Sequence, residues 1–169
     1  MSKFINPFSD FGFKKIFGSE VSKDLIISFL NGVLHEEVIV NITFRNVELL
    51  GMKQEQGKVV FDIFCENEKG EIFVVEMQKA RQKFFSDRIL YYASFAIQQQ
   101  TMIAREKTKK GKKKGDKKQW EYNINKVYIV CILNYVMDKS YPAKYRWDVV
   151  RMERELKIPF SETLNEVYL

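Results

Sequence analysis

Two acidic residues lie inside runs of apolar residues, where an ionised carboxylate is costly to bury. Asp62 lies in segment 59–65 and Glu76 in segment 72–78, and both segments are rich in β-branched and aromatic side chains. A carboxylate among bulky apolar neighbours needs a cation, a hydrogen-bond donor or a metal ion to compensate its charge. These two acids are therefore the first candidates for chemistry.

The two segments and the turn between them predict a β-hairpin. A loop of residues 68–70, with glycine last in the left-handed conformation, places Asp62 directly opposite Glu76, with Cβ atoms about 4.5–5.5 Å apart. In the same register Gln78 shares a face with Glu76 and lies beside Val60. Two carboxylates this close repel each other, and a divalent cation between them would remove the repulsion. The alternative is that each acid simply faces solvent on a half-exposed sheet.

The surrounding elements follow from the spacing of apolar residues and caps. Ser9 and Asp10 predict a capped helix over 11–17, on which Asp10 and Lys14 lie one turn apart. We also expect a second helix that stops near 32–36, an irregular strand over 38–52, a helix from 86 or 87 to about 105, and a buried strand over 125–136. This last strand would join the hairpin sheet through a parallel crossover. Segment 145–155 mixes strand and helix signals, and a strand-like run begins at 165–169.

The predicted fold class is therefore α/β, in the order α-β-β-β-α-β, with a mixed central sheet flanked by helices and a C-terminal β extension. At 169 residues the chain suits one domain over 1–169, and it ends inside a strand-like run, so we expect it to be cut from a longer protein. No signal segment or membrane span is visible. Cys65 and Cys131 fall in predicted strands and have no metal-ligand spacing. We therefore expect them to be reduced core thiols of a cytoplasmic protein.

The positive charge of the chain is concentrated in one segment. The net charge is +6, but between Arg105 and Lys118 nine Lys or Arg residues face two acids. We predict a lysine-rich loop at 106–119. It is either only solvated or also a clamp for nucleic-acid phosphates, which needs charge but no fixed geometry. Its candidate DNA-contacting residues are Lys109, Lys110, Lys112, Lys113 and Lys114.

Five stretches resemble the family of recombination-promoting nucleases and transposases within the PD-(D/E)XK superfamily. They are 10–18 (DFGFKKIFG), 29–31 (FLN), 62–64 (DIF), 76–78 (EMQ) and 88–92 (RILYY). The resemblance covers roughly the whole chain and implies a restriction-endonuclease-like core.

The resemblance also assigns a metal site. It gives Asp62 the part of the superfamily aspartate and Glu76 that of the second acid, with the backbone carbonyl of Met77 as a third ligand. The implied ion is Mg²⁺, with Mn²⁺ as a substitute. Gln78 stands where most relatives have lysine, and its amide can orient a water but supplies no charge and no base. Asp10 is an additional acid for the site, although a helix cap explains it equally well.

The implied activity is metal-dependent DNA endonuclease cleavage, associated with recombination or mobile elements. The alternative, favoured by Gln78, is a non-catalytic DNA-binding or assembly module that retains the nuclease scaffold. We expect DNA as partner and no membrane, and leave a homodimer open. Besides the loop, the proposed DNA contacts are Lys14, Lys79, Arg81, Arg88 and Tyr92, and for each one a solvated surface residue is the simpler alternative.

Overall fold

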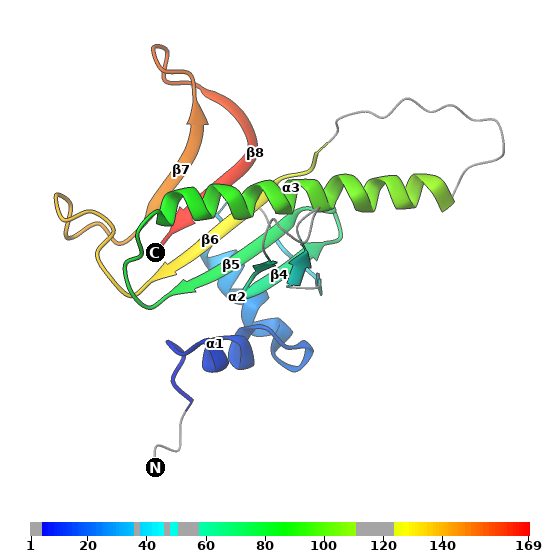
Figure 1. The fold of residues 1–169 in the computed structure, drawn as a ribbon, viewed down its shortest axis with the longest axis horizontal. Helices are drawn as coiled ribbons and strands as arrows, with labels where there is room; N and C mark the ends of the chain where they lie inside the picture. Colours follow the sequence, from blue (N-terminus) through cyan, green and yellow to red (C-terminus); the bar gives the residue numbers. More distant parts are fainter. Residues whose placement is uncertain (1–4, 36–37, 46–47, 51–57, 111–123) are drawn as a thin grey trace.

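The computed structural model describes residues 5–35, 38–45, 48–50, 58–110 and 124–169. A mixed six-stranded sheet forms its centre, in the order β1-β4-β5-β6-β8-β7 (Figure 1). Strand β5 pairs antiparallel with β4 and parallel with β6, β8 lies parallel to β6, and β7 closes the sheet antiparallel to β8. The strands are β1 (Ile42–Phe44), β4 (Ile63–Asn67), β5 (Ile72–Gln78), β6 (Val127–Leu133), β7 (Trp147–Met152) and β8 (Pro159–Tyr168).

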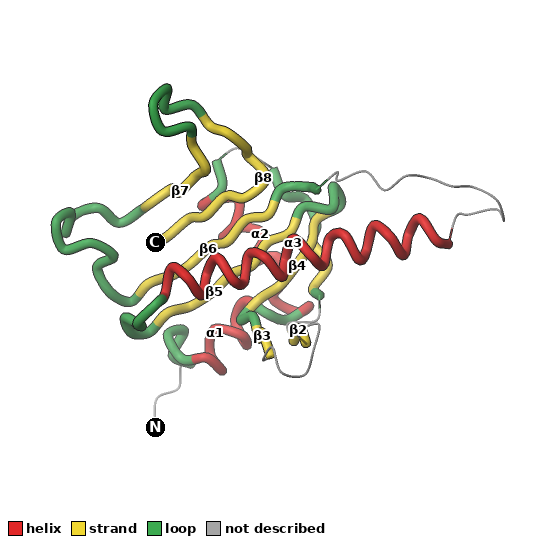
Figure 2. The backbone as a smooth tube through the Cα atoms, turned by 45° about the horizontal axis from the view of Figure 1, so that its top comes forward, coloured by secondary structure: helices red, strands yellow, loops and turns green. Residues whose placement is uncertain are grey.

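Helices cover both faces of this sheet. Helices α1 (Asp10–Phe17) and α2 (Lys23–Val33), joined by the 3₁₀ turn Glu20–Ser22, belong to one face, and the long helix α3 (Phe85–Lys110) lies across the other (Figures 1 and 2). The predicted fold class, including the C-terminal β extension of β7 and β8, is confirmed. Within the described residues, no helix combines the length and apolar character needed to cross a membrane.

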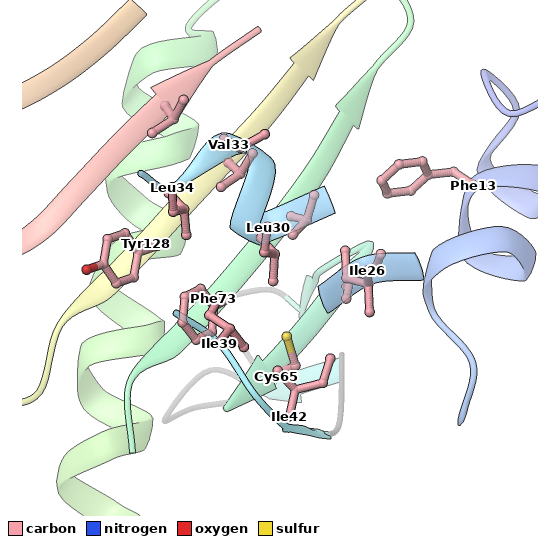
Figure 3. Packing of buried hydrophobic residues seen from close by; sticks show 14 residues of the cluster. Phe13, Ile26, Leu30, Val33, Leu34, Ile39, Ile42, Cys65, Phe73 and Tyr128 are labelled. Carbon is pink, nitrogen blue, oxygen red and sulfur yellow. The ribbon is translucent and has the colours of Figure 1, made fainter. Parts of the chain in front are cut away.

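Alternation along the strands produces the two cores. On the α2 face, Leu30 packs toward Phe73 and Tyr128, whose rings stack with centroids 5.2 Å apart (Figure 3). On the α3 face, Ile89 packs with Val74, which points to the opposite side of the sheet from Phe73 because successive residues of a strand face opposite sides. A sheet covered on both faces explains why β5 and β6 are almost continuously apolar.

The predicted hairpin and its register are confirmed. Ile63 pairs with Val75 and Phe64 with Val74, which is the register that places Asp62 opposite Glu76. Gly70 closes the three-residue loop with φ 79°, the left-handed conformation that glycine adopts without strain.

The first strand of this hairpin is shorter than predicted. The chain bends at Asp62, and the residues before it form β3 (Lys58–Val60), which pairs with β2 (Glu48–Leu50) in a separate two-stranded sheet. Val60 therefore does not lie beside Gln78, and the strand predicted over 38–52 is divided between the two sheets.

The bend has a packing cause. In a regular strand Phe61 and Ile63 would face the same side, but Phe61 is buried on the α3 face and Ile63 on the α2 face. The ring of Phe61 packs against Phe64 at 5.1 Å and edge-on against Tyr92 at 5.3 Å. The sequence pattern alone does not reveal which face takes the aromatic ring.

Helix α3 is also longer than predicted. It continues to Lys110, so the first part of the expected lysine-rich loop at 106–119, with Lys109 and Lys110, is helical. Lys, Thr and Glu are compatible with a helix, and Gly111 is the first residue that disfavours one. The remainder, with Lys112, Lys113 and Lys114, lies outside the described residues.

Candidate active site

The two acids meet at one edge of the sheet. Asp62 directly precedes β4 and Glu76 lies near the end of β5, and antiparallel pairing brings these two ends together. The Asp62 N–H donates to Glu76 Oε1 at 3.2 Å, and the Met77 N–H donates to Asp62 Oδ2 at 2.8 Å. The predicted convergence of the two side chains is thus present in the structure.

Burial makes this pair unfavourable when both acids are ionised. Glu76 is only 4% exposed, and burial, followed by the nearby charge of Asp62, raises the pKa of Glu76 from 4.5 to about 8. Burial also raises the pKa of Asp62, although the Met77 N–H and the Lys14 ammonium act in the opposite direction. A proton or a cation is needed to stabilise the pair.

Helix α1 brings a lysine to these acids. Lys14 Nζ lies 2.7 Å from Asp10 Oδ1 and 3.4 Å from Asp62 Oδ1. Burial alone would lower the pKa of Lys14, but the hydrogen bond to Asp10 and the charges of Asp10 and Asp62 raise it. The sequence placed Asp10 and Lys14 on one helix face but did not predict that Lys14 would pair with Asp62. The i, i+4 spacing was the available signal.

Helix α3 borders the pair from the other side. The Arg88 guanidinium lies 5.7 Å from the Phe85 ring centroid and 5.6 Å from that of Tyr92, and its Nη1 donates to Gln82 Oε1. Arg88 Nε and Nη2 are buried and have no hydrogen-bond partner among the described residues. Burial raises the pKa of Tyr92, with a smaller contribution from the charge of Glu76. Arg88 and Tyr92 thus lie near enough to the acid pair for their charges to interact with Glu76, and their proposed DNA contacts stay predictions.

Gln78 is the last residue of β5 and, two residues after Glu76, points to the same α3 face. It is 6% exposed, and its backbone carbonyl accepts a hydrogen bond from the Asn134 N–H at 2.9 Å. The neutral amide is therefore held at the same edge of the sheet as the acids.

The donor set suits a hard cation. Mg²⁺ binds through one or two carboxylates and otherwise retains water, so Asp62 and Glu76 with one backbone carbonyl suffice. Among the described residues, no group of three or more His, Cys, Asp or Glu side chains is placed to hold a metal. Asp10 therefore does not join the pair in such a group, and its carboxylate is bound to Lys14.

Two further predicted DNA contacts follow β5 in the chain. Lys79 is exposed directly after β5. Arg81 Nη2 donates to the carbonyls of Val136 and Met137, and its guanidinium lies 5.3 Å from the Tyr135 ring, so this side chain holds the segment after β6.

The mixed sheet flanked by helices, with an acid pair where β4 begins and β5 ends, is compatible with a restriction-endonuclease-like fold. The family model for PD-(D/E)XK nuclease family transposases matches residues 7–169, and the chain belongs to that family. The suspected family is confirmed. Searches of curated proteins and of solved structures find no match.

Proposed function

We propose that this chain is a Mg²⁺-dependent DNA endonuclease that hydrolyses phosphodiester bonds. One observation carries the proposal: Asp62 and Glu76 converge in a site so buried that the pKa of Glu76 rises to about 8. A structural role alone does not explain why Glu76 is buried next to a second, half-buried carboxylate, that of Asp62.

Asp62, Glu76 and the carbonyl of Met77 are the proposed ligands of the cation. A divalent cation held there would neutralise the pair and supply Lewis-acid activation for attack on the phosphate. The Gln78 amide is the proposed group that orients the attacking water. Arg88, whose buried Nε and Nη2 atoms have no hydrogen-bond partner among the described residues, is a proposed DNA contact on the α3 side of the pair.

Several features support the finer assignments. An all-oxygen donor set favours Mg²⁺, with Mn²⁺ as a substitute. The family's description as transposases supports a role in recombination or mobile elements. Cys65 and Cys131 are buried free thiols, which supports a cytoplasmic location.

The test is nicking of supercoiled plasmid DNA by the purified protein with and without Mg²⁺. We expect Mg²⁺-dependent nicking that is lost in Asp62→Asn and Glu76→Gln and retained in Glu68→Gln. Glu68 lies exposed in the turn of the same hairpin, so this variant controls for loss of an acid as such. Equal nicking by all four proteins would assign the activity to a contaminant and refute the proposal.

The second candidate is a DNA-binding or assembly module without catalysis. Gln78 favours it, because a neutral amide at this position provides neither charge nor base. It predicts DNA binding that falls with salt, no nicking at any metal concentration, and equal DNA affinity with Mg²⁺ and with EDTA.

A further inference from the structure

The acid pair lacks a cation from its own strands. Negative charge spreads over the phosphate oxygens in phosphoryl transfer, and a fixed donor to such charge is typically worth about 10²–10³ in rate. The Gln78 amide can donate a hydrogen bond but brings no positive charge. If the site cleaves DNA, another element has to supply the cation.

Lys14 lies where such a cation is needed. Its Nζ is 3.4 Å from Asp62 Oδ1, while the other oxygen of the same carboxylate, Oδ2, accepts from the Met77 N–H. The ammonium thus approaches Asp62 on the side away from the β5 backbone. A phosphate bound next to Asp62 would lie within reach of the Lys14 ammonium.

The start of α1 is built to hold Lys14 in this place. Ser9 caps the helix through the Gly12 N–H, and Phe13 is 2% exposed in the core of the α2 face. A Cβ at Gly12 would lie 1.9 Å from the Asn6 carbonyl oxygen, so only glycine permits this close approach. With Phe13 anchored, the next side chain is directed to the acids and is half-buried, whereas Lys15 is exposed.

Asp10 completes the arrangement. Its carboxylate is exposed but pairs with Lys14 at 2.7 Å from one turn earlier on the same helix. Other cations near the end of β5 are placed differently. Arg88 lies on the α3 side, where its charge lowers the pKa of Glu76, Arg81 donates to two backbone carbonyls after β6, and Lys79 is exposed directly after β5.

We propose that Lys14 is a catalytic residue that donates a hydrogen bond to a non-bridging oxygen of the scissile phosphate, and that Asp10 is a positioning residue for Lys14. This inference rests on the proposed nuclease function. It gives the N-terminal helix, rather than β5, the task of supplying positive charge to the reacting phosphate.

The chemical step leaves Lys14 unchanged. A water oxygen bonds to phosphorus, and the bond from phosphorus to the leaving sugar oxygen breaks. One proton of the attacking water passes to solvent, and the leaving oxygen takes a proton from solvent. Lys14 keeps its protons and stabilises the charge that develops on the phosphate.

The experiment compares Lys14→Met, which keeps the aliphatic stem, with the matched control Lys15→Met. For Lys14→Met we expect a single-turnover rate at saturating DNA that is about 100-fold lower, with DNA affinity within about threefold of wild type. Lys15→Met should keep the wild-type rate. Lys14→Arg, which retains the charge, should be faster than Lys14→Gln, and these two variants also serve if Lys14→Met does not fold.

Calorimetric titration with Mn²⁺ alone, without DNA, gives a readout independent of activity. Lys14→Met should bind Mn²⁺ at least as tightly as wild type, because it removes a competing cation from Asp62. Asp10→Asn should lower the cleavage rate and leave Mn²⁺ affinity unchanged.

The outcomes separate this inference from the proposed function. If wild-type protein does not cleave, the proposed function fails and this inference with it. If wild type cleaves and Lys14→Met matches its rate, or if Lys14→Arg and Lys14→Gln are equal, only the inference is overturned. Loss of Mn²⁺ binding in Lys14→Met or Asp10→Asn would also overturn it, because these residues would then maintain the metal site rather than act on phosphate.

Discussion

Replacing Glu76 with glutamine should stabilise the metal-free protein at neutral pH. Glu76 has a pKa of about 8 in the folded chain against 4.5 ordinarily, so between these values the unfolded state binds fewer protons than the native state. Stability therefore falls as pH rises through this window. At about 1.4 kcal/mol per pH unit, the native state loses about 3 kcal/mol between pH 4.5 and 7.

Glutamine carries no charge at any pH and can still accept the hydrogen bond from the Asp62 N–H. The free energy of unfolding of Glu76→Gln should therefore be about 3 kcal/mol higher than that of wild type at pH 7. For a domain of this size, this corresponds to a Tm about 6–12 °C higher. The advantage should vanish near pH 4.5. The assay is urea and thermal denaturation in EDTA from pH 4 to 9, with Glu68→Gln as an exposed control. If Glu76→Gln is no more stable than wild type at pH 7, the burial and charge argument is refuted.

Three further predictions follow from the same geometry. Mn²⁺ binding by wild type should tighten between pH 6 and 9 and release protons, and calorimetry in two buffers should show neither effect in Glu76→Gln. Adding Gln78→Lys to Lys14→Met should recover at least about tenfold of the lost cleavage rate, and no gain would mean that the two positions do not serve the same phosphate. Deleting 111–118 should reduce the salt dependence of DNA binding measured by anisotropy, without changing the rate at saturating DNA.

Local rules predicted the part of the site that depends on one hairpin. The turn ending at Gly70 sets the register, and the register alone places Asp62 against Glu76. The alternation of β5 likewise places Gln78 on the same face as Glu76. These features required no knowledge of the rest of the fold.

Tertiary packing determined what local rules missed. The bend at Asp62 depends on Phe61 being buried on the α3 face, which no spacing within the strand reveals. The pairing of Lys14 with Asp62 depends on how Phe13 anchors α1 to a sheet that is distant in sequence. The sequence showed the spacing of Asp10 and Lys14, but only the contact between Lys14 and Asp62 shows that this helix face is directed to the acid pair.

The most direct test of the central claim is a crystal structure of the protein grown with Mn²⁺ and a short DNA duplex. Anomalous scattering locates the ion independently of any assumption about its ligands. The account predicts a peak between the carboxylates of Asp62 and Glu76, within bonding distance of both, and none there in Glu76→Gln. An anomalous map with no peak at this position at millimolar Mn²⁺, or with the Mn²⁺ peak at another site on the DNA, would contradict the proposed metal site.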